Sequence, residues 1–402
     1  MRVSTSFIHN QNVKSMLQQQ SDLIKTQQQL ASGKKNLSPS DDPSAAARIL
    51  GLNDALNKIT QHEENAVFAT QRLSIEETTL ASAENILQRV RELSIQAGNT
   101  ATLDIPAREA IAQEIFELNE ALFDLANIKD SNGEYLFSGF QSSTQPFTLD
   151  AAGNYIYNGD QGQLALQIGN NRQVLSNDSG ADVFQLVRDG NGDFATDNDA
   201  TNTGNGLIST GSVQNPATFL SDDYIIRFTS ATTFEVDNVT TATANIIGSQ
   251  TYVEGGSISF DGLEVAISRS PANGDVFNVD ASRNQNVLTN LQDLVNVIRN
   301  SPDSFPGEAQ YSQGIATAIN NIDRSMENFI NIRTKVGARL NSIDVQNNDN
   351  DARKLQFSSI RSQIEDLDFA EAISQLTFQT TALQAAQQSF VKVQGLSLFN
   401  FI

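Results

Sequence analysis

The last fifty residues constrain the fold most strongly, because an apolar residue recurs there at every seventh position. Four residues follow one another at this spacing: Phe369, Leu376, Leu383 and Phe390. Ile373, Thr380 and Gln387 occupy the companion positions, and residues 356–397 contain no proline. The pattern predicts one long helix that packs against another helix. Such a helix would reach roughly 60 Å at 1.5 Å per residue, and its partly polar seam predicts that it needs partners.

The composition limits what else the chain does. Its 402 residues are enough for two or three domains. The absence of cysteine excludes disulfides and thiolate chemistry. A net charge of −21 argues against a nucleic-acid partner, and no apolar run approaches the ~18 residues that a membrane span needs. Residues 1–12 lack the apolar core of a secretory signal, which by itself would indicate a cytoplasmic protein.

Acidic residues are concentrated in the middle of the chain. Between residues 141 and 280 there are 17 acidic and four basic residues, a net of −13. Residues 1–60 carry seven basic and four acidic residues, a net of +3. We therefore expect the middle to be a solvated outer face and the less charged ends to pack against other helices.

Helical periodicity begins near the N-terminus and is interrupted once before residue 98. A loose apolar stripe ends at Ala31 and is followed by Gly33, which predicts a first helix and its C-terminal turn. In the segment Ser40-Asp41-Asp42-Pro43, Asp42 is a suitable N-cap and Pro43 a suitable first residue for a second helix. The second helix has apolar or small residues at strict seven-residue steps: Leu52, Ile59, Ala66, Leu73, Leu80 and Leu87.

A third helix is expected from Pro106, and at Asp130 the pattern changes to short alternating runs typical of strands. The expected strands are Tyr135–Phe137, Phe147–Leu149, Tyr155–Tyr157, Tyr224–Phe228, Thr233–Val236, Ser257–Phe260, Leu263–Ile267 and Val276–Val279. Helical patterns return at Asn284 and continue as a heptad from Ile315 to Ile343. The predicted fold class is therefore α+β, with long terminal and core helices in a coiled coil or helical bundle and an inserted all-β domain.

The order of the elements, helices on both sides of a β region, predicts discontinuous nested domains. We expect a terminal coiled-coil assembly domain of residues 1–42 and 352–402, and a helical core domain of residues 43–140 and 281–351. Residues 141–280 are expected to form an outer acidic β domain.

The sequence offers little for catalysis or cofactor binding. It contains none of the common nucleophile, zinc-protease or phosphate-loop motifs, and His9 and His62 lie in polar helical surroundings. The acidic stretch Asp189–Asp199 begins like a calcium loop, but Phe194 stands where glycine is needed and Ala200 where the final glutamate is needed. We predict no enzyme activity, no cofactor and no metal, and we interpret this stretch as an acidic surface turn.

Several motifs occur in a characteristic order along the helical flanks. They are Met1–Thr5, Ala31–Lys35, Pro39–Pro43, Asp130–Phe140, Gln379–Ala385 and Gln394–Phe399. Together they resemble the family of the bacterial flagellar hook-associated protein 3, a relative of flagellin. The resemblance covers about half of the chain, and the β region matches only loosely, around Gly274–Val279.

This resemblance implies a structural role at the junction between the flagellar hook and its filament. The implied partners are further copies of the chain in a ring, hook-associated protein 1, flagellin and a flagellar export chaperone. The implied location is the extracellular flagellum, reached unfolded through the flagellar type III export channel.

The resemblance also assigns roles to residues. The terminal helices would interlock with neighbouring subunits, the apolar seam near the C-terminus meeting Leu17 and Ile24 and adjacent copies. The implied assembly interface is Phe7, Leu17, Ile24, Leu30, Phe369, Ile373, Leu376, Leu383, Phe390 and Leu396, with Ser40, Asp41, Asp42 and Pro43 as a joint. Two alternatives remain open: a flagellin filament subunit, or a calcium-binding surface adhesin.

Overall fold

A computed structural model describes residues 5–99, 104–300 and 305–395. The helices are α1 (Thr5–Ser32), α2 (Pro43–Ala97), α3 (Ile105–Ala126), α4 (Val287–Asn300), α5 (Phe305–Glu365) and α6 (Phe369–Gly395). The chain divides into two compact units, which we call the terminal unit (residues 1–64 and 345–402) and the central unit (residues 65–344). The predicted fold class is confirmed: long helices flank a β region.

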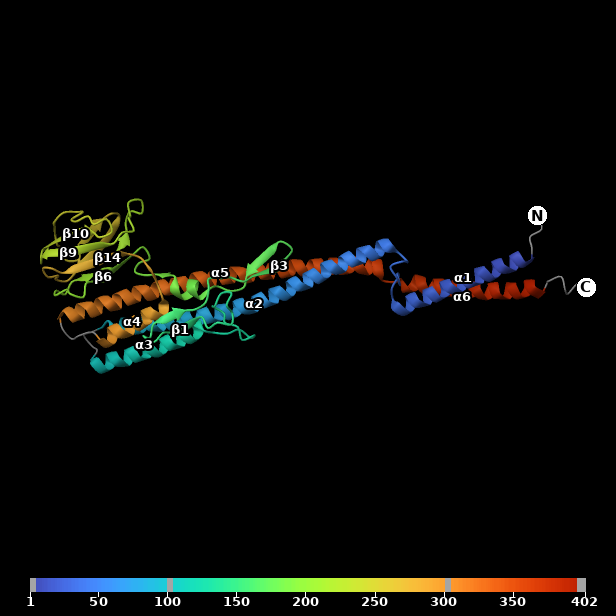
Figure 1. Ribbon diagram of the computed structural model, residues 1–402, viewed down its shortest axis with the longest axis horizontal. Coiled ribbons are helices and arrows are strands. Elements are labelled where there is room, and N and C mark those ends of the chain that lie inside the picture. Colours follow the sequence, from blue (N-terminus) through green and yellow to red (C-terminus); the bar gives the residue numbers. More distant parts are fainter. Residues whose placement is uncertain (1–4, 100–103, 301–304, 396–402) are drawn as a thin grey trace, which may run out of the picture. The chain divides into compact units, whose positions relative to one another are not determined.

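In the terminal unit, α1 and α6 lie side by side over most of their lengths (Figure 1). The two helices are antiparallel, because Gly33 and Leu367 meet at one end while the His9 and Phe390 rings lie 5.1 Å apart at the other. The start of α2 and the end of α5 complete this unit, with Lys354 of α5 paired to Glu63 of α2 at 2.6 Å.

The prediction of one helix over residues 356–397 is wrong in one respect, since the helix is interrupted at residues 366–368. The Asp368 carboxylate caps α6 by accepting hydrogen bonds from the N–H groups of Ala370 and Glu371, at 2.9 and 3.1 Å. The Leu367 N–H donates outside the helix, to the Gly33 carbonyl at 2.9 Å. A capping aspartate inside an apolar repeat thus starts a new helix while the seven-residue pattern continues.

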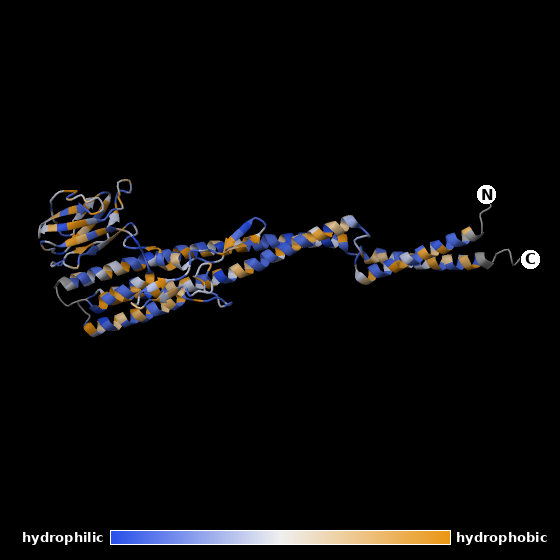
Figure 2. Cartoon of the chain, viewed as in Figure 1, coloured by the Kyte–Doolittle hydropathy of each residue, from blue (hydrophilic) through white to orange (hydrophobic). Residues whose placement is uncertain are grey.

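The helical core of the central unit follows the predicted heptads. On α2, residues Ala66, Leu73, Leu80 and Leu87 are all buried in this core. The predicted position before them, Ile59, is buried in the part of α2 that belongs to the terminal unit. On α5, the buried positions also recur every seven residues: Ile315, Ile322, Phe329, Val336 and Ile343. Figure 2 shows the corresponding hydrophobic stripes along both helices. α3 packs along α4, and residues of both helices contribute to the same core.

The β region begins with small hairpins that cover the helices and ends in a two-layer domain. The strands are β1 (Phe147–Leu149), β2 (Tyr155–Tyr157), β3 (Ala165–Gly169), β4 (Arg172–Leu175), β5 (Val187–Arg188), β6 (Phe194–Asn198), β7 (Leu207–Ile208), β8 (Ser212–Val213), β9 (Tyr224–Ser230), β10 (Thr233–Asn238), β11 (Gln250–Thr251), β12 (Ser257–Phe260), β13 (Leu263–Ser268), β14 (Val276–Ala281) and β15 (Asn284–Gln285). A short π-helix, η1 (Ala181–Gln185), lies between β4 and β5.

Two sheets form the outer β domain. One has the strand order β11-β10-β9-β14-β6, and the other has the order β12-β13-β7 with β8 also on β13. Their buried side chains belong to one apolar cluster separate from the helical core, to which β9 contributes Tyr224, Ile226 and Phe228 and β13 contributes Leu263, Val265 and Ile267. The domain is therefore a small sandwich whose two sheets share one core.

Most predicted strands are confirmed, with ends that differ by up to two residues. Tyr135–Phe137 is not a strand: Leu136 and Phe137 are buried in the helical core, and Tyr135 makes an isolated bridge to Lys129. The residues of this run are apolar because the turn is buried, and not because they pair with a neighbouring strand. The helix expected at Asn284 begins at Val287, because Asn284 and Gln285 pair with β5.

Candidate assembly surfaces

The joint of the terminal unit connects α1 to α5 through backbone hydrogen bonds. The Lys35 N–H donates to the Glu365 carbonyl at 2.8 Å, and the Lys34 ammonium pairs with the Glu365 carboxylate at 2.6 Å. Gly33 has φ +70°, the left-handed conformation that ends α1 and that other residues rarely adopt. The segment between α1 and α2 is thereby fixed to the end of α5.

Asp41 and Asp42 have different tasks within this joint. Asp41 accepts hydrogen bonds from the Leu37 and Ser38 N–H groups and from the Lys25 ammonium at 2.8 Å. The Lys25 hydrogen bond, aided by the backbone donors, lowers the pKa of the Asp41 carboxyl. Asp42 caps α2, as predicted, by accepting from the N–H groups of residues 44 and 45 at 3.0 and 2.9 Å, and Pro43 is the first residue of the helix.

The α1–α6 pair leaves an apolar surface open. Three of the predicted interface residues on α6 are half-buried along α1: Leu376, Leu383 and Phe390. Leu30 is half-buried as well. The other described residues of the set remain largely exposed, with 45–62% of the residue accessible: Phe7, Leu17, Ile24, Phe369 and Ile373. Leu396 lies outside the described residues.

The expected contact between the α6 seam and Leu17 and Ile24 is corrected by this burial pattern. The less exposed face of α1 consists of Met16, Gln19, Leu23, Thr26 and Leu30, at alternating three- and four-residue steps. This spacing is that of a coiled-coil seam, whereas Leu17 and Ile24 lie one position further along the helix and point outward. Leu17 and Ile24 are therefore free in the single chain to contact something else.

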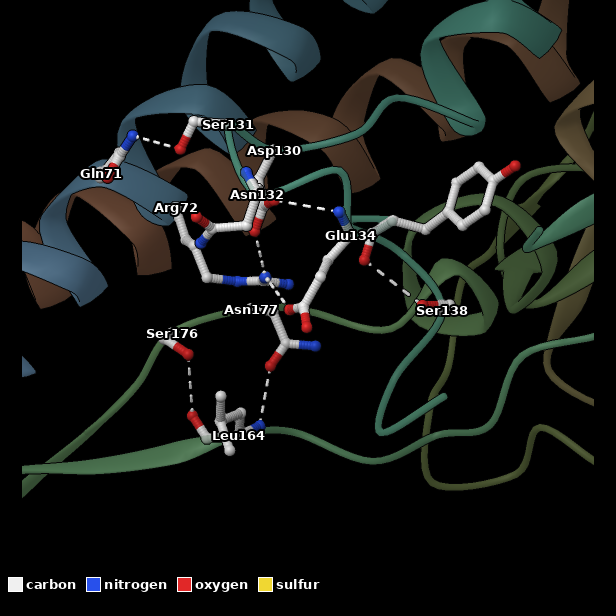
Figure 3. Close-up of polar contacts among 11 residues, drawn as sticks. Gln71, Arg72, Asp130, Ser131, Asn132, Glu134, Ser138, Leu164, Ser176 and Asn177 are labelled. Atoms are coloured by element: carbon white, nitrogen blue, oxygen red, sulfur yellow. Dashed lines mark hydrogen bonds and ion pairs between the residues drawn. The ribbon is translucent and has the colours of Figure 1, made fainter. Parts of the chain in front are cut away.

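In the central unit, a polar clamp holds the turn that follows α3 (Figure 3). Arg72 of α2 is buried and donates from Nη1 to Asp130 Oδ2 at 2.6 Å and to Glu134 Oε2 at 3.4 Å. Asp130 Oδ1 accepts from the N–H groups of Asn132 and Glu134, at 2.8 and 3.1 Å. Gln71 donates to Ser131 Oγ at 2.6 Å. A turn that would otherwise face solvent is thus fixed to α2.

The clamp positions the next residues of the chain. Leu136 donates its N–H to the Ile128 carbonyl at 3.0 Å and is fully buried. The Phe137 ring packs edge-on against Phe184 of η1, with 5.4 Å between centroids. In the same region, Asn177 accepts the Leu164 N–H at 2.7 Å (Figure 3). The motif Asp130–Phe140 therefore has a structural task, the attachment of the β hairpins to the helical core.

The acidic stretch Asp189–Asp199 forms the turn between β5 and β6 together with β6. Two of its carboxylates accept hydrogen bonds from backbone donors, Asp189 from the Arg283 N–H at 2.7 Å and Asp199 from the Thr201 N–H at 2.8 Å. Across residues 5–99, 104–300 and 305–395, no group of three or more histidine or carboxylate side chains is placed to hold a metal ion. Within the same ranges, no helix is long and apolar enough to cross a membrane.

Known proteins share this arrangement of helices and β domain. Residues 3–142 match the bacterial flagellin N-terminal helical region, and residues 319–402 match the bacterial flagellin C-terminal helical region. Residues 197–281 match the D2-like domain of flagellar hook-associated protein 1. Flagellin of Bacillus subtilis is 29% identical over 167 residues, covering 40% of this chain and 52% of its own.

The relatives that match over the full length of the chain are hook-associated proteins. The flagellar hook-associated protein 3 of Salmonella typhimurium is 24% identical over 399 residues, which is 99% of both chains. The crystal structure of flagellar hook-associated protein 3 from Legionella pneumophila is 32% identical, with a TM-score of 0.75, covering 79% of this chain and 98% of that one. The chain belongs to the flagellar hook-associated protein 3 family. It is a structural component of the bacterial flagellum, as are its relatives.

The two regions described above, the terminal helices and the Arg72 clamp, differ in how far the sequence predicted them. The exposed apolar residues of α1 and α6 lie within the flagellin-like regions, where sequence analysis predicted an interface. The Arg72 clamp was not predicted, since only the change of pattern at Asp130 and the motif Asp130–Phe140 were recognised. Arg72 lies on a partly polar face of a heptad helix and is far from the turn in the sequence. Nothing in the sequence around it indicates which residue it pairs with. The clamp connects residues 58 positions apart.

Proposed function

We propose that this chain forms the junction that connects the flagellar hook to the flagellin filament. The observation that supports this function is how much of the chain each kind of relative matches. The hook-associated protein 3 relatives match 99% of the chain, β domain included, whereas the Bacillus subtilis flagellin matches 40% of it. A filament subunit, the weaker alternative, would not be expected to share its β region with the junction protein.

The partners proposed for the junction follow from what its ends resemble. Flagellin-like helices at both ends suit a place in a tube built from such helices, so we propose self-association in a ring and contact with flagellin on the filament side. Contact with hook-associated protein 1 is proposed on the hook side, and the D2-like match at residues 197–281 supports a common outer architecture. We further propose type III export with the help of a flagellar chaperone, and no catalytic role.

We retain the terminal helices as the proposed assembly interface, in two classes. The exposed residues Phe7, Leu17, Ile24, Phe369 and Ile373 would contact neighbouring subunits directly. The half-buried residues Leu30, Leu376, Leu383 and Phe390 would hold α1 and α6 together so that the exposed set keeps its arrangement. Leu396 is proposed as part of the same interface, and Ser40–Pro43 as the joint.

The finer division of the chain is a proposal as well. We propose that residues 1–42 and 352–402 act as the assembly domain, 43–140 and 281–351 as the helical core, and 141–280 as the outer β domain. Two observations support it. The segment between α1 and α2 is fixed to the end of α5 by hydrogen bonds, and the apolar core of the β sandwich is separate from the helical core.

A deletion strain tests the junction function. Without this chain, cells are expected to complete their hooks, release flagellin into the medium and carry no filaments. The purified protein is expected not to form long homopolymers, because a junction subunit need not present the surface that it recognises. Normal filaments in the deletion strain, or long homopolymers in vitro, would identify a filament subunit instead.

Point variants test the interface. Ile24→Asp places a charge on the exposed apolar surface of α1, where a neighbouring subunit would have to desolvate it. We expect filament assembly in the complemented deletion strain to be lost while the circular dichroism of the free chain is unchanged. Ile24→Leu, which keeps an apolar side chain at the same position, is the control and is expected to complement. Full complementation by Ile24→Asp would remove this residue from the interface.

A further inference from the structure

The outer β domain is hollowed at one open edge of its sandwich. The hollow has a volume of about 600 Å³ and lies where β10 and β11 of one sheet approach β12 of the other. Phe234 and Ile258 line it with buried apolar side chains, each 5% exposed, and Val253 contributes an exposed one. No charged side chain is among the residues that line it in the described part of the chain. The hollow thus offers an apolar site beside two edge strands.

β12 presents unpaired backbone groups to this hollow. It pairs with β13, and no other described strand continues the ladder on its far side. The two strands are joined by Asp261 and Gly262, with φ +42° and +82°, a two-residue turn of the kind that closes on a hydrogen-bonded pair. Such pairs alternate along an antiparallel ladder, so the N–H and C=O groups of Ser257 and Ser259 point away from β13.

The surroundings of the edge are negatively charged. Glu254 follows Val253 in the chain, and Glu264 of β13 accepts a hydrogen bond from Ser257 Oγ at 2.8 Å. Both carboxylates are thus next to residues that line the hollow. Residues 141–280 as a whole carry 17 acidic and four basic residues. A positively charged partner is favoured here, and a second copy of this acidic domain is disfavoured.

We propose that this edge binds an extended segment of another protein, which adds a strand to β12. The backbone of Ser257 and Ser259 would pair with the segment, which selects an extended peptide over a helix. The residue of the segment that lies opposite Ile258 would place an apolar side chain in the hollow. Its neighbours in the segment point the other way and favour lysine or arginine near Glu264.

A model peptide tests the proposal with the full-length chain. The probe is a fluorescein-labelled hexapeptide of alternating lysine and valine, and its counterpart alternates glutamate and valine. Fluorescence anisotropy is expected to show saturable binding of the lysine peptide and none of the glutamate peptide. Hydrogen exchange is expected to slow at the amides of residues 257–260 when the lysine peptide binds. Binding without protection at these amides would place the peptide elsewhere and overturn the proposal.

Variants separate strand addition from charge attraction. Ser259→Pro removes an outward N–H and is expected to weaken binding about tenfold, while Ser259→Thr keeps that group and is expected to bind like the natural chain. Glu264→Gln is expected to weaken binding. Asp193→Asn removes one charge as well, but Asp193 lies in the turn between β5 and β6, away from the hollow, so this variant is expected to bind like the natural chain. Equal weakening by these two variants would overturn the proposal. Concentration-dependent self-association of the chain that Ser259→Pro abolishes would overturn it as well.

Discussion

At the scale of single residues, α2 buries a carboxyl group, Glu76, that makes no ion pair with a described residue. Glu76 of α2 is fully buried, and its two oxygens accept no hydrogen bond from the described residues. The Asp178 carboxylate lies near it and is already occupied by Arg339, with nitrogen–oxygen distances of 2.8 and 2.9 Å. Burial, together with repulsion from Asp178, raises the pKa of Glu76 well above its ordinary value. Burial thus favours the neutral acid form of Glu76 over the carboxylate.

This arrangement predicts a pH dependence of stability with a definite sign. The unfolded chain loses the Glu76 proton near the ordinary pKa of 4.5, whereas the folded chain keeps it to higher pH. Stability from this group is complete below pH 4.5 and is lost as the pH rises through the raised pKa. Glu76→Gln is expected to remove that loss. The free energy of unfolding of the variant, measured by urea denaturation, should therefore fall less between pH 5 and pH 9 than that of the natural chain. Glu117→Gln on the exposed face of α3 is the control. Parallel pH profiles for Glu76→Gln and the natural chain would show that Glu76 ionises normally.

A second residue-scale prediction concerns the clamp. Arg72 and Asp130 have side-chain accessibilities of 4% and 2%, so Arg72→Ala leaves a buried carboxylate without its cation. We expect a loss of about 3 kcal/mol in the free energy of unfolding. Arg89→Ala, which breaks the exposed pair with Glu114 at 2.7 Å, is expected to cost less than about 1 kcal/mol. Chemical denaturation of both variants measures the difference, and similar losses would mean that burial does not decide the contribution.

At the scale of elements, α6 has one face on α1 and another that is open. Leu383 belongs to the face on α1, where Leu376 and Phe390 occupy equivalent positions one heptad away. The faces are thus separable by substitution. Substitutions on the α1-facing side act on the helix pair, and those on the open side act on contacts with neighbours.

Leu383→Asp is expected to separate α6 from α1 and to abolish assembly, because a charge cannot be desolvated in this seam. The core of the central unit shares no apolar cluster with these helices, so its melting temperature is expected to stay within about 1 °C of that of the natural chain. Gln384→Asp, on the exposed side of α6, is the control for the helix pair and is expected to leave α6 packed on α1. The readouts are filament formation in the complemented strain and calorimetry of the purified chain. A large fall in the melting temperature of the central unit would contradict the independence of the two units.

At the scale of the whole molecule, the division into two compact units predicts a pattern of proteolysis. The terminal unit presents exposed apolar residues and is held by the α1–α6 pair, the joint and polar contacts between α2 and α5 such as Lys354–Glu63. Both large apolar clusters lie in the central unit. Limited trypsin digestion of the free chain is expected to cut before about Ser40 and after about Leu355 and to leave a resistant fragment. Mass spectrometry of the fragment locates its ends. Resistance of both ends at the same protease concentration would show that the terminal unit is as stable as the central one.

Features that depend on local periodicity and short-range chemistry could be predicted from the amino-acid sequence. The seven-residue recurrence predicted the buried faces of α2 and α5, including Leu73, Leu80 and Phe329. Asp42 and Pro43 predicted the start of α2, because a cap acts within three residues of itself. The order of its motifs predicted the family.

The tertiary structure decided the features that depend on partners distant in the chain. The break before α6 combines a local cap at Asp368 with a bond from Leu367 to Gly33, which lies more than 300 residues earlier. Leu17 and Leu23 are both apolar and lie less than two turns apart on α1. Packing against α6 decides that Leu23 is on the inner face and Leu17 on the outer one. Arg72 met Asp130, and Arg339 met Asp178, only once the chain had folded. A charge pattern shows which residues carry charge but not which of them folding brings together, and burial then determines how strongly each pair contributes.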